Sequence, residues 1–109
     1  MTVEQLLNAA NLKPICVPEP EREIDGAYIG DLLSWVMGRA TENSAWITIM
    51  SNSNIVAVAT LADVSCIILA EGVSPDEGVA GTAMARGVNL LSSAESAYEI
   101  AKRLSGLGL

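Results

Sequence analysis

The chain has 109 residues, half of them hydrophobic, and a formal net charge of −7 from 13 acidic and six basic side chains. A chain of this length forms one domain whose core needs no metal ion or disulfide to hold it. The basic residues are scattered along the sequence, so we expect no binding to nucleic acid and none to an anionic membrane surface.

The sequence contains no histidine and only two cysteines, Cys16 and Cys66. It therefore lacks the residues for Ser-His-Asp or Cys-His catalysis and for histidine-based metal sites. Cys66 lies in an apolar run typical of a buried strand, and Cys16 has no activating neighbour. No run approaches the ~20 residues of a membrane span, and the first residues lack a signal-peptide pattern. We expect a cytoplasmic protein without a metal or other cofactor.

The N-terminal part of the chain combines a helix, a strand and an acidic loop. The helix is predicted over Val3–Asn11 with Thr2 as its cap, and the strand over Lys13–Val17. A proline- and glutamate-rich segment follows and reads as a solvated loop. We expect residues 1–23 to pack on a main α/β domain that comprises residues 24–109.

The rest of the chain alternates strand and helix patterns. Strands are predicted at Ile24–Gly30, Ala45–Met50, Cys66–Ala70 and Val88–Leu91. Such alternation with short connections predicts an α/β fold, with a mainly parallel sheet of about four to five strands and flanking helices.

Three of the helices are predicted from their first residues. Asp31 begins the first, and its apolar face comprises Leu32, Leu33, Val36, Met37 and Ala40. A later helix begins at the capping pattern Ser74-Pro75-Asp76-Glu77 and ends at Gly87. The last begins at a second capping pattern, Ser92-Ser93-Ala94-Glu95. Its inward residues are predicted to be Ala97, Tyr98, Ile100, Ala101 and Leu104.

The segment Ile55–Ala62 fits two structures. Its β-branched residues could pair with Ala45–Met50 in a hairpin across a Ser/Asn turn. Alternatively, Asn54 caps a helix, which fits the alanine content. We favour the helix because the segments on both sides already alternate strand and helix.

Small polar and acidic residues follow each predicted strand, so they would meet at one edge of a parallel sheet. The candidate ligand-binding residues at this edge are Gly30, Asp31, Ser51, Asn52, Ser53, Asn54, Glu71, Gly72, Ser74, Ser92 and Ser93. Free N–H groups at helix N-termini attract anions, although the same residue types are also ordinary caps. Asp31 and Glu71 could pair for Mg²⁺ binding or acid–base chemistry, but we favour a structural role for each. The sequence has no phosphate-binding loop, and we assign no catalytic residue.

Five segments in order resemble the DRTGG domain family. They are Asp25-Gly26-Ala27, Trp46–Met50, Ile67–Gly72 with Pro75 after it, Gly87–Ser92 and Ser96–Glu99. The resemblance covers about Ile24 to Leu104 and includes the order and spacing of the strand–helix units. The segment Ser51–Asn54 stands where the family has its Asp-Arg-Thr residues, and Glu71-Gly72 where it has paired glycines.

The resemblance implies a regulatory module. Related domains occur within phosphotransacetylases and between CBS domains of inorganic pyrophosphatases. Stand-alone forms are labelled HPr-kinase-like, and some resemble proteins encoded beside iron-only hydrogenases. Kinase activity is not implied, because the resembling domain is non-catalytic.

We therefore expect a non-catalytic sensor or adaptor that acts on a metabolic enzyme and binds a nucleotide-like or other anionic metabolite. The resemblance implies a hydrogenase-associated enzyme as one such partner. The alternative is a purely structural homodimerisation module without a ligand, and a small enzyme ranks last. The high apolar content also predicts a homodimer. Its contact would be the helix face with Trp35 and Met37, or the edge near Ile55–Leu61.

Overall fold

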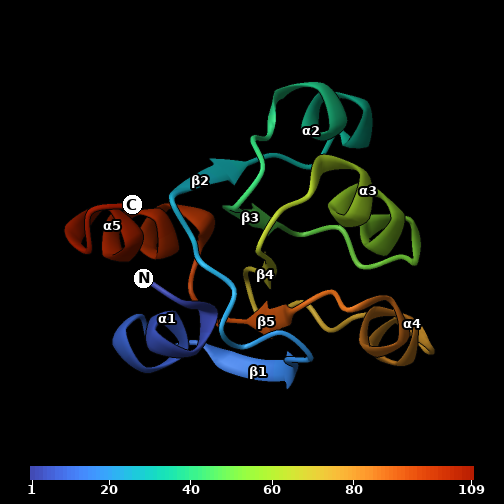
Figure 1. Ribbon diagram of the computed structural model, residues 1–109, viewed down its shortest axis with the longest axis horizontal. Helices are drawn as coiled ribbons and strands as arrows, with labels where there is room; N and C mark the ends of the chain where they lie inside the picture. The colour runs from blue at the N-terminus through green and yellow to red at the C-terminus, as the bar shows by residue number, and fades with distance from the viewer.

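The computed structural model describes residues 1–109 and shows a five-stranded sheet between two layers of helices (Figure 1). The strands are β1 (Lys13–Cys16), β2 (Gly26–Ile29), β3 (Ser44–Thr48), β4 (Cys66–Leu69) and β5 (Leu90–Ser92). The helices are α1 (Val3–Ala9), α2 (Leu33–Arg39), α3 (Asn54–Ala62), α4 (Val79–Arg86) and α5 (Ala97–Gly106). The predicted α/β class is confirmed. None of these helices has the length and apolar character needed to cross a bilayer.

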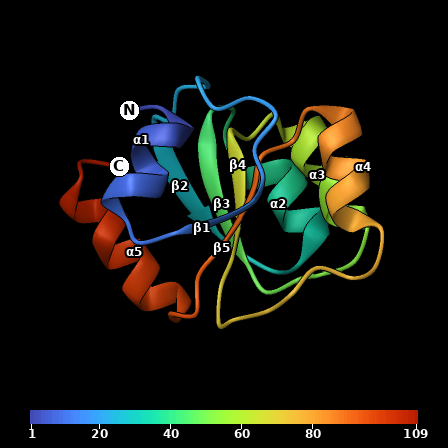
Figure 2. The ribbon, with the colours of Figure 1, turned by 90° about the horizontal axis from the view of Figure 1, so that it is seen from below.

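The order of strands in the sheet is β1-β5-β4-β3-β2. Strands β2 to β5 are parallel and each lies beside its predecessor, whereas β1 is antiparallel to β5. Each of the parallel strands β3, β4 and β5 is added on the same side of the strand before it. Because the connections between parallel strands are right-handed, α2, α3 and α4 all lie on the same face of the sheet. Helix α5 follows β5 on the opposite face, where α1 also lies (Figure 2).

The sheet separates two hydrophobic clusters, because successive residues of a strand point to opposite faces. One cluster lies under α1 and α5 and contains Leu6, Ile47, Ile68, Ile100 and Leu104. The other lies under α2, α3 and α4 and contains Val36, Trp46, Ile55, Ile67 and Leu90. Strands β3 and β4 are buried throughout, as expected for parallel strands that are covered on both faces.

The first 23 residues share this core. Thr2 caps α1 as predicted: its hydroxyl accepts a hydrogen bond from the Gln5 backbone, and the Gln5 side chain accepts one from the Thr2 N–H. Val3 and Leu6 of α1 are fully buried in the cluster under α5. Strand β1 then completes the sheet beside β5.

The ambiguous segment is a helix, α3, so the favoured interpretation is confirmed. The predicted cap is wrong by one position, since Asn54 is the first residue of the helix and Ser53 precedes it. The side chain of Asn52 accepts a hydrogen bond from the Asn54 N–H at 2.9 Å. This local turn, rather than a cap by Asn54, leads the chain into α3.

The predicted start of α2 at Asp31 is also wrong, because the helix begins at Leu33. The Asp31 carboxylate accepts hydrogen bonds from the Thr48 hydroxyl at 2.8 Å and the Ile49 N–H at 2.9 Å. Asp31 therefore joins the ends of β2 and β3 instead of capping a helix. The apolar face of α2 is narrower than predicted: Val36 is buried, whereas Leu32 and Met37 are exposed. 

Helix α4 begins later than its predicted capping pattern. Its first residue is Val79, and it follows Gly78, whose φ of 86° is in the left-handed region. Asp76 is held elsewhere: its carboxylate accepts from the Ser51 hydroxyl at 2.9 Å, and its N–H donates to the Ser51 carbonyl at 2.9 Å. The segment after β4 is consequently a loop. The predicted end of α4 at Gly87 is confirmed.

Helix α5 begins four residues later than predicted, at a second Ser-x-x-Glu pattern, Ser96–Glu99, that directly follows Ser92–Glu95. Ser96, not Ser92, caps it by accepting a hydrogen bond from the Glu99 N–H at 3.2 Å. Glu95 instead forms an ion pair with Arg103, at 2.8 Å from its Nε. Of the predicted inward residues, Ile100 and Leu104 are buried and Ala97 and Ala101 are partly buried. Tyr98 is 72% exposed, so its predicted inward position is wrong.

Candidate functional site

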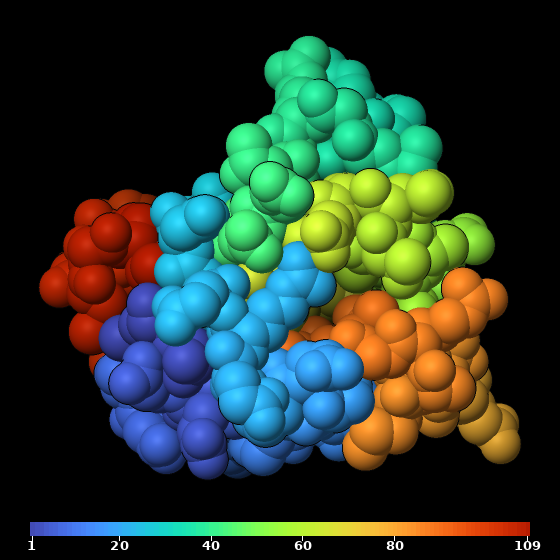
Figure 3. Space-filling model, viewed as in Figure 1, coloured from blue at the N-terminus to red at the C-terminus, as the bar shows by residue number.

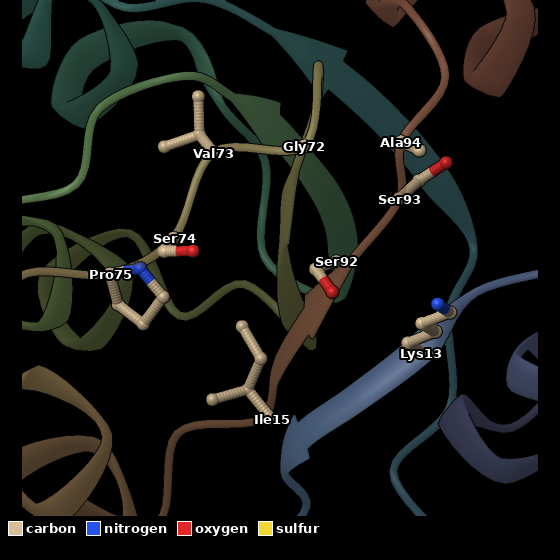
Figure 4. Close-up of a pocket in the computed structure, with 9 residues that line it drawn as sticks. All are labelled: Lys13, Ile15, Gly72, Val73, Ser74, Pro75, Ser92, Ser93 and Ala94. Atoms are coloured by element: carbon tan, nitrogen blue, oxygen red, sulfur yellow. The ribbon is translucent and has the colours of Figure 1, made fainter.

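The clearest concave feature lies where β4 and β5 end. The loop after β4 leads to α4 on one face of the sheet, and the loop after β5 leads to α5 on the other. In α/β sheets, ligands bind in the crevice at such a divergence of neighbouring strand ends. A pocket of about 270 Å³ opens there (Figure 4). Its lining residues are Lys13, Ile15, Gly72, Val73, Ser74, Pro75, Ser92, Ser93 and Ala94.

Backbone hydrogen bonds hold the two loops of the pocket together. The Gly72 N–H donates to the Ser93 carbonyl at 2.9 Å, and the Glu71 N–H donates to the Glu95 carbonyl at 2.8 Å. Glu71 and Gly72 both have positive φ, 62° and 70°, which turns the chain sharply after β4. A glycine tolerates this conformation without strain, whereas Glu71 must be held in it by the surrounding contacts.

Strand β1 supplies the third wall of the pocket. Its antiparallel register places Lys13 opposite Ser92, so the first residue of β1 lies at the carboxyl end of β5. The Lys13 side chain is exposed and forms no ion pair. It is the only charged residue among those lining the pocket. The pocket therefore presents one free ammonium group in a chain of net charge −7.

The walls of the pocket combine apolar and polar side chains. Val73, Pro75 and Ile15 lie on one side of the opening together with Ser74, and Lys13 and Ser93 lie on the other together with Ala94 (Figure 4). The hydroxyl of Ser93 already accepts a hydrogen bond from the Glu95 N–H at 3.0 Å but keeps its own proton free to donate. An ammonium group, serine hydroxyls and apolar walls suit a small anion that carries a flat or apolar substituent.

The structure divides the predicted ligand-binding residues into two groups. The pocket contains Gly72, Ser74, Ser92 and Ser93. Outside it lie Gly30, Asp31, Ser51, Asn52, Ser53, Asn54 and Glu71. Several of these bind other parts of the protein: the Gly30 carbonyl accepts from Trp46 Nε1 at 2.8 Å, and Ser51 binds Asp76.

The two carboxylates considered for Mg²⁺ binding are not brought together. Asp31 follows β2 and Glu71 follows β4, and β3 lies between these strands. Strands two positions apart in a sheet are separated by about 10 Å. The carboxylate of Asp31 is also occupied by Thr48 and Ile49. No group of three or more Cys, Asp or Glu side chains is arranged to hold a metal ion.

Five pocket residues were not among the predicted ones. Val73, Pro75 and Ala94 lie in the loops after β4 and β5, next to predicted residues, whereas Lys13 and Ile15 lie on β1. These two belong to a strand whose partner is far away in the sequence, since Lys13 pairs with Ser92. Lys13 and Ile15 reach the pocket because β1 pairs with β5. The one available signal was a lysine at the start of a short strand pattern in an acidic chain.

Neither cysteine is an activated nucleophile. Burial raises the pKa of the Cys66 thiol to about 12, with the charge of Arg22 opposing the shift. Burial also raises the pKa of Cys16, whose Sγ donates to the Val88 carbonyl at 3.6 Å. Raised pKa values keep both groups as thiols at neutral pH, and the thiolate is the reactive form.

These features define a three-layer α/β domain with a small pocket at diverging strand ends. The sequence model of the DRTGG domain matches residues 20–107, and the chain belongs to this family. No curated protein matches the sequence.

A solved structure with the same fold is the crystal structure of the CBS and DRTGG domains from the regulatory region of Clostridium perfringens pyrophosphatase, complexed with its activator, diadenosine tetraphosphate. The TM-score is 0.73 over 94% of the present chain, at 12% sequence identity. The match spans 45% of the pyrophosphatase chain. The similarity thus concerns the fold of one part of that larger regulatory region.

Proposed function

We propose that this DRTGG domain is a non-catalytic regulatory module that senses a small anionic metabolite in the pocket between the β4 and β5 loops. The observation that carries the proposal is the unpaired Lys13 ammonium group at the mouth of that pocket. The related pyrophosphatase region is regulatory and binds a nucleotide activator, which supports nucleotides as the first compounds to test.

The pocket chemistry favours a phosphate or carboxylate group next to Lys13. An ammonium group forms charge-assisted hydrogen bonds with such oxygens, and the hydroxyls of Ser92 and Ser93 add neutral donors. The apolar walls formed by Ile15 and Pro75 suit a base or an acyl chain. A volume of about 270 Å³ is just below the usual range for small-molecule sites. A mononucleotide fragment or an acyl phosphate therefore fits better than a complete dinucleotide.

The same residues argue against catalysis. The chain has no histidine, and its two thiols stay protonated at neutral pH because burial raises their pKa. The pocket contains no carboxylate that could act as a general base. We infer that any effect of the ligand is exerted on a partner, which the family resemblance suggests is a cytoplasmic metabolic enzyme, with a hydrogenase-associated enzyme as one case.

A thermal-shift screen with mononucleotides, acetyl phosphate and inorganic phosphate tests the proposal. A ligand at 100 times its Kd stabilises the folded state by about 2.7 kcal/mol, which raises the melting temperature. Lys13→Met should abolish the shift. Lys102→Met is the matched control, because it removes the same charge from an exposed position on α5 outside the pocket.

Two outcomes would contradict this function. If Lys13→Met and Lys102→Met lose the shift equally, the ligand responds to net charge and not to the pocket. If no compound shifts the wild-type chain, the alternative of a structural dimerisation module without a ligand is favoured.

A further inference from the structure

The two edges of the sheet differ in how they are protected. Strand β1, at one edge, begins with Lys13 and Pro14, and its register against β5 shifts between Pro14 and Cys16. Lysine, proline and irregular pairing are features by which natural proteins keep an edge strand from pairing with another chain. Strand β2, at the other edge, has the sequence Gly-Ala-Tyr-Ile and pairs with β3 without a register shift. The β2 edge therefore lacks all three of these protections.

The outer backbone groups of β2 belong to Ala27 and Ile29. The N–H of Gly30, directly after the strand, donates to the Ile47 carbonyl of β3 at 3.2 Å, so the backbone groups of Gly30 point toward β3. Because these groups alternate in direction along a strand, those of Ala27 and Ile29 point away from β3. No backbone hydrogen bond outside the sheet involves either residue. Both residues thus offer an N–H donor and a carbonyl acceptor to a further strand.

The surface around this edge is open and partly apolar. Ile29 pairs with Ile47, whose side chain lies in the cluster under α5, so Ile29 lies on the same face of the sheet. Ile29 is nevertheless 49% exposed, and Ile49, directly after β3, is 48% exposed. Figure 3 shows that the molecule is hollowed between α5 and α2, in the corner where Figure 1 places β2. A strand added to β2 would enter this recess and cover Ile29.

Carboxylates without an ion-pair partner lie at both ends of β2. Asp25 directly precedes the strand. Glu42 lies at the same end, because the Asp25 N–H donates to the carbonyl of the next residue, Asn43, at 3.0 Å. Asp31 follows the strand at its other end. None of these three acidic residues forms an ion pair. A strand added to β2 would therefore have negative charge near both of its ends.

The arginines nearest in the sequence do not neutralise this acidic surface. Arg22 is paired with Asp63, and the guanidinium of Arg39 lies 3.7 Å from the centre of a tryptophan ring. An extended segment with basic residues would find unpaired partners at both ends of β2, whereas a second copy of β2 would not. In an antiparallel pair of two β2 strands, Asp25 of each chain would approach Asp31 of the other, and like charges repel.

We propose that the edge of β2 binds an extended, basic segment of a partner protein, which is added to the sheet as a further strand. The backbone groups of Ala27 and Ile29 form the hydrogen bonds of the new ladder, and Asp25 and Asp31 bind lysine or arginine side chains of the segment. In strand addition, main-chain hydrogen bonds give affinity and alternate side chains give specificity. Strand β2 lies at the edge opposite to β1, which lines the pocket, so the proposal does not depend on Lys13.

A short fluorescent peptide, in which valine and threonine alternate between a lysine at each end, tests the proposal by fluorescence anisotropy. The full chain should bind it with a Kd below about 1 mM. The same peptide with glutamate ends should bind at least about tenfold more weakly. A version with N-methylated amides on alternate residues should not bind, because methylation removes the donors of the ladder. Bound peptide should also slow the hydrogen exchange of the Ala27 and Ile29 N–H groups.

Two variants of the protein test the two parts of the contact. Ala27→Pro removes an outward donor and leaves the hydrogen bonds to β3 intact, so it should weaken binding about tenfold while circular dichroism shows a folded protein. Asp25→Lys should weaken binding about fivefold, because it replaces an attraction by a repulsion. Glu77→Lys is its matched control: it changes the net charge equally, but Glu77 is exposed in the loop before α4.

Four results would overturn the proposal. The first is a wild type that does not bind the lysine peptide below about 1 mM. The second is equal binding of the N-methylated peptide, since no ladder would then form. Equal losses for Asp25→Lys and Glu77→Lys would show a response to net charge alone. The last is a wild type that sediments at twice its mass of 11.4 kDa while Ala27→Pro sediments as the monomer, because a second copy would then occupy the edge.

Discussion

Arg22 joins the loop before β2 to Asp63, the residue that ends α3. Its Nη2 donates to the Asp63 carbonyl at 2.6 Å and to the Asp63 carboxylate at 2.7 Å. Asp63 has a left-handed backbone, with φ of 57°, as is common where a helix ends. The positive charge also lies at the C-terminus of α3, where the helix dipole favours it. One side chain thus fixes the N-terminal segment to the opposite helical layer.

Replacing this arginine should destabilise the fold measurably. Arg22→Met should lower the free energy of unfolding by about 1 kcal/mol, because the pair is partly exposed and solvent weakens it. Urea unfolding at neutral pH measures the change. Arg86→Met is the control, since Arg86 forms no ion pair. Equal effects of the two substitutions would show that Arg22 acts only through net charge.

Asn89 should be more costly to replace than any exposed polar residue. It is 1% exposed and binds three backbone groups: the Glu19 N–H and carbonyl at 2.9 and 2.8 Å, and the Ser65 carbonyl at 3.0 Å. Asn89→Ala leaves these groups without their partner, so we expect a loss of about 3 kcal/mol. Urea unfolding of Asn89→Ala and of the exposed-site control Asn54→Ala provides the comparison. A loss below that of Asn54→Ala would mean that water replaces the amide.

The capping position of α5 can be tested by three serine-to-alanine substitutions. Ser96→Ala should cost about 1 kcal/mol, because Ser96 accepts the hydrogen bond that caps the helix. Ser74→Ala and Ser92→Ala should change the stability by less than about 0.5 kcal/mol, since neither hydroxyl caps a helix. Thermal unfolding followed by circular dichroism measures all three. A larger loss for Ser92→Ala than for Ser96→Ala would contradict the observed start of α5.

The buried thiol of Cys66 should lower the free energy of unfolding in alkaline solution. In the unfolded chain the thiol ionises near its ordinary pKa of 9.0, whereas in the folded protein burial raises the pKa to about 12. Between these values the unfolded state binds fewer protons, so stability falls as pH rises. The slope from this group approaches about 1.4 kcal/mol per pH unit.

The difference between the wild type and Cys66→Ala isolates this contribution. The variant is expected to be less stable than the wild type below pH 9 because it leaves a small cavity, but its stability should fall less steeply above pH 9. Urea unfolding at intervals from pH 8 to pH 11 gives both slopes. Parallel slopes would show that the folded protein also ionises the thiol.

The order of strands and helices could be predicted because it depends on local patterns. Runs such as Cys66–Leu69 are apolar throughout, since parallel strands are buried on both faces. The favoured helix at α3 was correct for the same kind of reason, because a hairpin would have broken the alternation. The uncharged outer side of α3 explains why the segment was ambiguous: it lacks the polar stripe of an ordinary surface helix.

The helix starts could not be predicted, because tertiary contacts compete for the capping side chains. The sequence has the Ser-x-x-Glu pattern twice in succession, at Ser92 and at Ser96. Glu95 pairs with Arg103 in the last turn of α5, so its side chain is not available to complete the first capping pattern. Asp31 behaves similarly, since its carboxylate binds the end of β3. The partners of Asp31 lie 17 and 18 residues away, on another strand, so the local pattern at Asp31 does not reveal them.

The pocket includes only part of the predicted strand-end edge. The predicted residues lie at the ends of strands or after them, but the pocket forms only beside β4 and β5, where the chain leaves toward opposite faces. The two loops diverge because α4 and α5 lie on opposite faces of the sheet. Lys13 enters the pocket through β1, whose position beside β5 no local pattern indicates.

The pairing of β1 with β5 also determines the order in which the strands of the sheet can assemble. These are the first and last strands of the chain, and Lys13 pairs with Ser92. During synthesis, β2, β3 and β4 can assemble while β5 is still inside the ribosome, but β1 must wait for the last strand to emerge. Until then the open side of β4 and the apolar side of α1 remain uncovered. Contacts between residues so far apart in sequence slow folding, so closure by β5 and β1 should be the late step and the one most exposed to aggregation.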